Sequence, residues 1–122
     1  MYTANSKKIE ALIANYFEGI FEGDTDKLKA CFHKNAYLYG DIKGVDYLKS
    51  SKEYLEGVKN RQSPKDLQET YKMKTIGIDI IGKIAMVKLQ VPMLGYNYYD
   101  YLSLAKIDNE WKIVNKLFTH VD

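Results

Sequence analysis

Residues 96–104, YNYYDYLSL, place a single carboxylate among four tyrosines and directly before two leucines that are two positions apart. In a β-strand, side chains alternate between the two faces, so Asp100 shares an apolar face with Tyr98 and Leu102. A buried carboxylate is costly unless it is paired or hydrogen-bonded. Carboxylates and phenols that meet in an apolar cavity supply what proton transfer next to a carbonyl requires: a base, and a donor that holds the enolate oxygen. Asp100 is therefore the candidate catalytic residue.

The turn at Asp108 and Asn109 joins this strand to the next one and decides which residue lies opposite Asp100. A two-residue loop requires a positive φ at both positions, whereas a three-residue loop over residues 107–109 requires it only at Asn109, which tolerates it. We therefore predict the three-residue loop, which places Asp100 opposite Lys116. The face that carries this pair would also hold Tyr96, Tyr98, Leu102, Leu104, Val114, Phe118 and His120. The other face would hold Tyr99, Tyr101, Ser103, Ala105, Trp111, Ile113, Asn115 and Leu117.

Two interpretations of the predicted Asp100 and Lys116 pair are open at this point. In the first, it is a cross-strand ion pair that stabilises the hairpin by roughly 0.2–1 kcal/mol. In the second, the pair lies in a cavity, where the hydroxyl of a tyrosine from the helices lies beside it. The ligand-binding residues predicted on this basis are Tyr16, Tyr54, Tyr98, Asp100, Lys116 and His120. Asp41 is a possible second acid, pointing either to the cavity or to solvent.

The composition argues against nucleic-acid, metal and cofactor chemistry. Eighteen Lys and Arg against sixteen Asp and Glu leave a net charge of +2, the lysines are scattered, and Arg61 is the single arginine, so we expect no nucleic-acid partner. The two histidines, His33 and His120, have no metal-ligand spacing to Cys31 or to a carboxylate, which predicts no metal site. The chain has no phosphate-binding glycine loop, and we expect no cofactor.

The first seventeen residues, MYTANSKKIEALIANYF, lack the uninterrupted apolar core of a signal peptide. No apolar run in the chain approaches the length of a membrane span. The single cysteine, Cys31, cannot form an internal disulfide and is compatible with a reducing compartment. We therefore expect a cytoplasmic protein without a membrane partner.

The spacing of apolar residues predicts helices in the first half of the chain. A helical stripe runs from Ile9 to Phe21, and a second, short helix would end at the polar residues 33–35, HKN. A short strand over residues 36–40 then precedes a third helix that would start after Gly44. The apolar stripe of this third helix would be Val45, Leu48, Leu55 and Val58.

The second half of the chain changes to a strand-like pattern from about residue 67. Four β-rich runs cover residues 70–82, 83–95, 96–107 and 111–120. Short turns join these runs, which predicts an antiparallel arrangement. Helices that precede strands, without a linker or an internal repeat, predict a single α+β domain over residues 1–122.

Four stretches of the chain resemble the nuclear transport factor two-like (NTF2-like) superfamily, and most closely its lumazine-binding, polyketide cyclase-like branch. These stretches are residues 16–36, 44–58, 76–89 and 99–118. The resemblance implies a cone-shaped, cystatin-like α+β barrel, in which a curved antiparallel sheet wraps over three N-terminal helices. It also implies a ligand cavity at the wide end of the cone and a homodimer formed through the outer face of the sheet.

The resemblance leaves the activity open, because this superfamily includes ketosteroid isomerase, polyketide cyclases, dehydratases and transport adaptors. Our first hypothesis is a domain that binds a small organic ligand in the cavity. The second is an isomerase-, cyclase- or dehydratase-type enzyme that uses Asp100 and the pocket tyrosines. The third is a dimeric protein-interaction module that uses the open face of the sheet.

Overall fold

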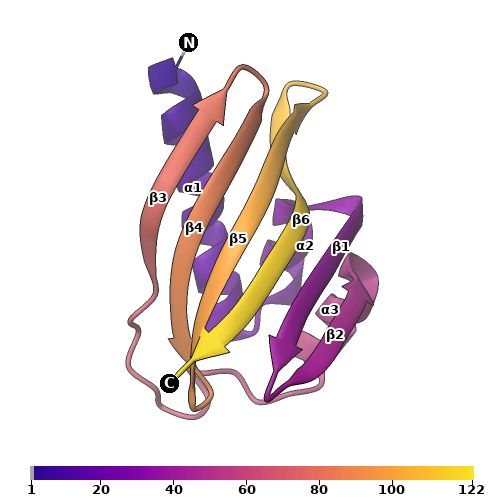
Figure 1. Cartoon of the computed structure of the whole chain (residues 1–122), viewed down its shortest axis with the longest axis vertical. Coiled ribbons are helices and arrows are strands. Elements are labelled where there is room, and N and C mark those ends of the chain that lie inside the picture. Colours follow the sequence, from indigo (N-terminus) through magenta and orange to yellow (C-terminus); the bar gives the residue numbers. More distant parts are fainter. Residues whose placement is uncertain (1) are drawn as a thin grey trace.

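A computed structural model describes residues 2–122, in which three helices cover one face of a six-stranded sheet (Figure 1). The helices are α1 (Tyr2–Glu22), α2 (Thr25–Cys31) and α3 (Ser51–Lys59). The strands are β1 (Phe32–Ile42), β2 (Val45–Ser50), β3 (Lys74–Ile81), β4 (Ile84–Met93), β5 (Tyr96–Ile107) and β6 (Glu110–Val121). This arrangement confirms the predicted α+β class.

The sheet has the strand order β2-β1-β6-β5-β4-β3. All neighbouring strands are antiparallel except β1 and β6, which pair in parallel. The sheet is therefore mixed, and it is open, with β2 and β3 as its two edges. The predicted curved antiparallel sheet over three N-terminal helices is thus confirmed as a fold, with two differences in detail: the sheet is not closed into a barrel, and β1, which enters from the helical half of the chain, runs parallel to β6.

The core lies between α1 and the covered face of the sheet. The predicted stripe of α1 is confirmed, since Ile9, Ile13 and Ile20 are almost fully buried. They join one cluster with residues such as Leu102 and Ile113 from the sheet. Burying each such aliphatic side chain contributes roughly 1.5–3 kcal/mol, so this layer fixes the position of α1 over the strands.

The segment between β1 and α3 differs from its predicted structure. Val45 and Leu48, predicted on the buried stripe of a helix, lie in β2 and are 67% and 58% exposed. The helix starts only at Ser51, because Ser50 and Glu53 form a capping box in which each side chain bonds the other residue's backbone N–H. The spacing of three between Val45 and Leu48 is helical, but two residues are too few to define a helix, so the cap is the better start signal.

The residues HKN at 33–35 do not end α2 as a turn. They lie within β1, in the stretch where the pairing of β1 with β6 shifts register between Phe32 and Tyr37. The ring of His33 accepts a hydrogen bond from the backbone N–H of Asn35 through Nδ1. The polar residues thus occupy an irregular part of a strand, where their side chains are at least partly exposed to solvent.

The β5–β6 hairpin turns through two residues, not three. Asp108 and Asn109 both adopt positive φ, 50° and 66°, and Ile107 pairs with Glu110. A further register shift follows near Ser103, so the predicted pairing is displaced by two residues and Asp100 lies opposite Phe118. Tyr98 correspondingly lies opposite His120, and Leu102 opposite Lys116.

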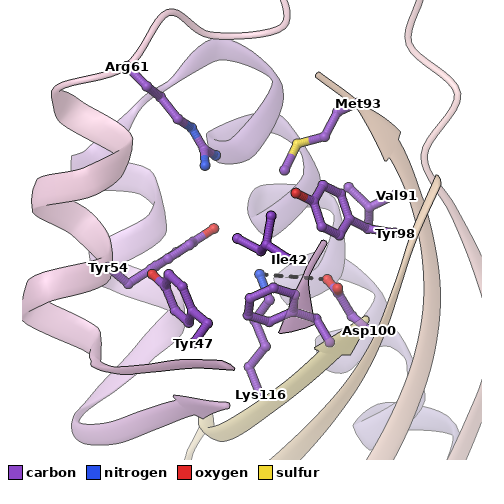
Figure 2. A pocket seen from close by; sticks show the side chains of 10 residues that line it. Ile42, Tyr47, Tyr54, Arg61, Val91, Met93, Tyr98, Asp100 and Lys116 are labelled. Atoms are coloured by element: carbon purple, nitrogen blue, oxygen red, sulfur yellow. Dashed lines mark ion pairs between the residues drawn. The ribbon is translucent and has the colours of Figure 1, made fainter. Parts of the chain in front are cut away.

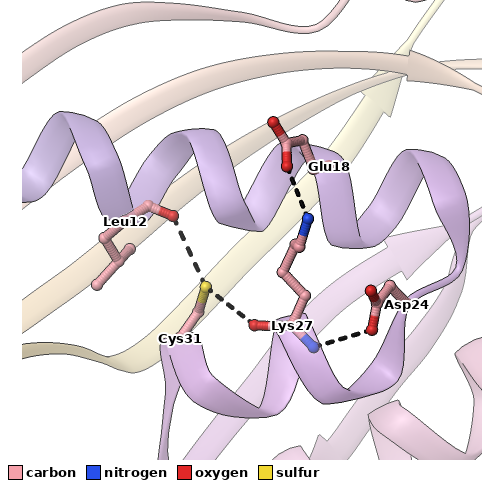
Figure 3. Close-up of polar contacts among 5 residues, drawn as sticks. All are labelled: Leu12, Glu18, Asp24, Lys27 and Cys31. Carbon is pink, nitrogen blue, oxygen red and sulfur yellow. Dashed lines mark hydrogen bonds and ion pairs between the residues drawn. The ribbon is translucent and has the colours of Figure 1, made fainter.

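Cys31 ends α2 and points into the contact between α1 and α2 (Figure 3). Its thiol lies 3.7 Å from the carbonyl oxygen of Leu12 and 3.4 Å from that of Lys27, and donates to these groups. Asp24 caps α2 by accepting a hydrogen bond from the backbone N–H of Lys27. Burial raises the pKa of the Cys31 thiol from 9.0 to about 11.

This shift of the Cys31 pKa predicts a loss of stability in alkaline solution. Between about pH 9 and 11 the thiol ionises in the unfolded chain but stays protonated in the folded one, so its contribution is full below pH 9 and is lost as the pH rises through this window. We expect the free energy of unfolding of Cys31→Ala, measured in urea from pH 8 to 10.5, to fall less steeply than that of the wild type. Parallel curves for the two proteins would show that the thiol does not contribute.

No helix among the described residues combines the length and the apolar character that crossing a bilayer requires.

Candidate active site

A small cavity of about 50 Å³ opens between the covered face of the sheet and α3 (Figure 2). Its walls come from five strands, from α3 and from the segment that follows α3. They are formed by Ile42, Tyr47, Tyr54, Arg61, Val91, Met93, Tyr98, Asp100, Lys116 and Phe118. Ligand pockets for drug-sized molecules usually span about 300–1,000 Å³, so this cavity fits only a compact molecule.

Asp100 lies at the floor of the cavity and is 2% exposed. The Tyr16 hydroxyl donates a hydrogen bond of 2.6 Å to its Oδ2 atom, and the Lys116 ammonium lies 3.8 Å from the same oxygen. Both of these contacts go to Oδ2, and no side-chain hydrogen bond among residues 2–122 reaches the other oxygen, Oδ1. The carboxyl group is thus held on one side and has free lone pairs on the other.

Lys116 is 5% exposed and its ammonium is surrounded by aromatic rings. The Nζ atom lies 4.7 Å from the ring centre of Tyr54, 5.2 Å from that of Phe118 and 5.3 Å from that of Tyr16. Cation–π attraction to these rings and the charge of Asp100 both hold the ammonium group at this position. Because Asp100 Oδ2 is beyond hydrogen-bond distance, the N–H groups of Lys116 can donate to a ligand.

Tyr16 reaches Asp100 from α1 and is fully buried. Burial, followed by the negative charge of Asp100, raises the pKa of Tyr16 well above its ordinary value. The phenol therefore stays protonated and serves as a donor that positions the carboxylate. Its ring does not line the cavity wall, so among the residues predicted to bind ligand, Tyr16 lies behind Asp100.

Tyr54 and Tyr47 form the wall opposite Asp100 (Figure 2). The hydroxyl of Tyr54 is buried and has no hydrogen-bond partner in the part of the chain that the structure describes. Burial, and then the neighbouring Tyr54, raises the pKa of Tyr47 to about 12. The Tyr47 phenol is therefore a neutral donor at physiological pH.

Tyr98 and His120 were both predicted to bind ligand, and the structure places them differently. Tyr98 lines the cavity, and burial raises the pKa of its phenol. His120 shares the face of Asp100, but its ring packs against Tyr96 at a centroid distance of 4.8 Å, outside the cavity wall. Its Nε2 atom accepts a hydrogen bond of 2.8 Å from the backbone N–H of Lys43, so it is already used to hold the β1–β2 turn.

Asp41, the possible second acid, points away from the cavity. It follows Gly40 on β1 and accepts a hydrogen bond from the Thr119 hydroxyl on the opposite face of the sheet from Asp100. Gly40 itself faces the cavity side, where a Cβ atom would overlap the ring of Phe118. The glycine thus leaves the space into which Phe118 packs, and the site has one carboxylate.

Arg61 was not among the predicted site residues, yet its guanidinium points into the cavity (Figure 2). Its Nε and Nη2 atoms are buried and have no hydrogen-bond partner within the described residues. Arg61 lies in the irregular segment after α3, where no strand or helix period predicts the direction of a side chain. The available signal was its status as the single arginine of the chain.

Within residues 2–122, no group of three or more His, Cys, Asp or Glu side chains is arranged to hold a metal ion.

Solved structures with a similar fold include three NTF2-like proteins of unknown function. Those from Silicibacter pomeroyi, Shewanella baltica and Methylobacillus flagellatus match with TM-scores of 0.86, 0.85 and 0.87, at 18%, 20% and 21% identity. These matches cover 98–100% of this chain and 94–99% of the others. A cystatin-like fold protein from Burkholderia xenovorans matches with a TM-score of 0.71. These likenesses show the fold.

Sequence comparison adds a relative and a family. The chain is 32% identical over 124 residues to aldolase FrzH of Cladobotryum sp., which covers 93% of this chain and 91% of that protein. The model of the family described as "Putative lumazine-binding" matches residues 4–119. The chain therefore belongs to this lumazine-binding-like family, and it shares its fold with the NTF2-like proteins.

Proposed function

We propose that the chain is an enzyme that removes a proton from the carbon next to a carbonyl group and uses the resulting enolate in an aldol-type reaction. The observation that carries this proposal is the environment of Asp100. One carboxylate oxygen is held by Tyr16 and lies near Lys116, while the other has no donor and belongs to a cavity wall. A base with a fixed position and free lone pairs is what such a proton transfer requires.

In the proposed step, Asp100 Oδ1 takes the proton and the C–H electron pair becomes the enolate. The developing charge on the enolate oxygen is stabilised by an N–H group of Lys116. The enolate carbon then attacks the carbonyl carbon of a second group, and the new alkoxide takes the proton back from Asp100. The proton is thus returned, and no oxidant or reductant is needed.

The similarity to aldolase FrzH supports an aldol-type reaction over the other activities of NTF2-like proteins. Aldolase FrzH is similar to this chain over nearly the full length of both, and its name identifies a reaction of carbonyl carbons. An isomerase that uses two acids, Asp100 and Asp41, is less well supported than the aldol-type reaction. Asp41 lies on the outer face of the sheet, where it accepts a hydrogen bond from Thr119. A binding protein without turnover is the alternative that the experiment below distinguishes.

Hydrogen–deuterium exchange tests enolate formation without knowledge of the natural substrate. A panel of small ketones and oxo acids in D₂O is followed by proton NMR, with and without the protein. We expect the protein to accelerate exchange of the α-protons of at least one compound above the buffer rate. If no compound exchanges faster, the cavity only binds its ligand and the proposed enzyme activity is rejected.

We also propose that the chain forms a homodimer through the face of the sheet that the helices leave open. Tyr39, Leu117 and Tyr101 lie side by side across β1, β6 and β5 on this face, and each is 44–49% exposed. Tyr37, Met86 and Val121 are further exposed apolar residues of the sheet. An apolar surface of this kind is typical of a protein interface.

The dimer predicts a specific effect of a charge at the centre of this face. We expect the wild type to sediment as a dimer at micromolar concentration and Leu117→Lys to sediment as a monomer, because a buried unpaired ammonium opposes association. Tyr2→Lys, at an exposed position on α1 behind the sheet, is the matched control and should stay dimeric. A monomeric wild type would contradict the proposal.

A further inference from the structure

We infer that the ligand of this cavity carries a carboxylate group, which Arg61 and Tyr54 bind at the end of the cavity away from Asp100. This inference extends the proposed aldol-type activity by naming the class of substrate, a small oxo acid. It rests on that activity for the reaction, whereas the binding of the carboxylate is argued from the cavity alone.

The unpaired atoms of Arg61 form one edge of its guanidinium group. Nε–H and one N–H of Nη2 point in the same direction, and these are the two atoms that are buried without a partner. Two parallel donors at this spacing match the two oxygens of a carboxylate, which they bind as a bidentate pair. A buried polar group without a hydrogen bond destabilises the protein, so a ligand that satisfies both donors would bind with a gain in stability.

Tyr54 supplies a third unpaired donor in the same space. Its hydroxyl is buried without a partner, like the edge of Arg61. Figure 2 shows the Tyr54 hydroxyl and the Arg61 guanidinium pointing into the cavity from the side of α3, with Asp100 on the opposite side. The convergence of three unsatisfied polar atoms from two residues indicates a binding site for an acceptor-rich group.

The charges of the cavity wall add up to one excess positive charge. Asp100 and Lys116 form an ion pair and cancel each other. Arg61 is the remaining charged residue of the wall, and no ion pair joins it to an acidic residue within residues 2–122. A ligand with a single negative charge would neutralise this excess in a site of low dielectric constant, where the attraction is strong.

The size and shape of the site favour a carboxylate over a phosphate. A cavity of about 50 Å³ has room for a few heavy atoms, and the planar edge of Arg61 fits the planar carboxylate. With its carboxylate on Arg61 and Tyr54, a small oxo acid would extend toward the floor. Its carbonyl oxygen would then reach Lys116, and the adjacent carbon would reach Asp100.

Titration with pyruvate tests the inference by binding, without any need for turnover. Pyruvamide is the neutral probe of the same shape, and inorganic phosphate is the anion of another class. By ligand-observed NMR, we expect wild-type protein to bind pyruvate at least tenfold more tightly than pyruvamide or phosphate. Pyruvamide or phosphate binding as tightly as pyruvate, or no detectable binding of pyruvate, would overturn the inference.

Variants of Arg61 locate the binding site. Arg61→Gln should weaken pyruvate binding roughly ten- to a hundredfold, because it removes a charge-assisted bidentate contact. Arg61→Lys keeps the charge but not the planar edge, so its affinity for pyruvate should lie between those of the wild type and Arg61→Gln. Lys59→Gln removes the same charge from the exposed end of α3 and should bind pyruvate like the wild type. Unchanged binding in folded Arg61→Gln would place the carboxylate elsewhere and contradict the inference.

Asp100→Asn separates this inference from the proposed enzyme activity. If pyruvate binds to the variant and to the wild type but neither protein exchanges α-protons, the carboxylate site stands and the aldol-type function fails. If exchange is observed with neutral ketones but pyruvate does not bind through Arg61, the enzyme activity stands and the carboxylate site is refuted.

Discussion

Replacing Asp100 with asparagine is expected to lower the rate of α-proton exchange by about 10²–10⁴-fold, the usual contribution of a general base. Asparagine has nearly the same shape, and its amide oxygen can still accept the hydrogen bond from Tyr16. It cannot take up a proton at neutral pH. The loss should therefore appear in the rate, measured by proton NMR in D₂O, and the binding of pyruvate should change much less.

The matched control for this prediction is Asp41→Asn. This variant makes the same chemical change on the outer face of the sheet, where Asp41 accepts a hydrogen bond from Thr119. We expect the Asp41→Asn protein to exchange α-protons at the same rate as the wild type. Because Asp100→Asn leaves Lys116 without its partner, both variants should be assayed well below their melting temperatures. An Asp100→Asn protein that keeps an exchange rate within threefold of the wild type would exclude Asp100 as the base.

The face of Asp100 could be predicted from the sequence even though the register was wrong. The hairpin turns through Asp108 and Asn109 alone, and the observed pairing differs from the predicted one by two residues. Side chains repeat with a period of two in a strand, so the shift of two around Asp100, over residues 97–103, keeps the residues of that part on their predicted faces. Lys116 is therefore diagonal to Asp100 rather than opposite it, and the two charges still lie 3.8 Å apart.

At the end of β6 nearest the hairpin, the predicted faces were wrong. The register shift between Ser103 and Leu104 gives β6 one extra residue, Val114. Trp111 and Ile113, predicted on the outer face, are consequently buried in the core. A bulge leaves no signature in an alternating pattern, because it reverses the alternation without interrupting the run of apolar residues.

The two tyrosines that reach the site from helices were predictable, whereas Arg61 was not. Tyr16 belongs to the predicted stripe of α1, and Tyr54 lies next to Leu55 of the predicted stripe of the third helix; both are buried in the structure. Arg61 lies after the end of α3, where the chain has no repeating direction. Only the tertiary structure brings it over the cavity, and with it the excess positive charge from which the ligand class is inferred.

The second large expected effect is on stability. Replacing Lys116 with methionine should lower the free energy of unfolding by about 3–5 kcal/mol, because it leaves the buried carboxylate of Asp100 without a compensating charge. Methionine fills a similar volume among the rings of Tyr16 and Tyr54, so loss of packing is a small part of the effect. Urea unfolding monitored by circular dichroism measures the change.

A surface ion pair provides the control for Lys116→Met. Lys27 lies only 2.8 Å from Glu18, closer than Lys116 is to Asp100, but both side chains are partly exposed to water. Lys27→Met should therefore cost much less stability, since water screens an exposed pair and solvates the carboxylate that is left behind. Equal losses for Lys27→Met and Lys116→Met would contradict the argument that burial determines the cost.

The double variant Asp100→Asn, Lys116→Met tests whether the cost comes from the unpaired charge. Neither charge is then left in the cavity floor, and a buried ion pair replaced by neutral groups is often close to neutral in stability. We expect the double variant to be more stable than Lys116→Met alone, with a coupling free energy between the two positions of about 0.5–3 kcal/mol. Additive losses would instead mean that Asp100 and Lys116 stabilise the fold independently, which would remove the reason for treating them as one charge-neutral unit at the cavity floor.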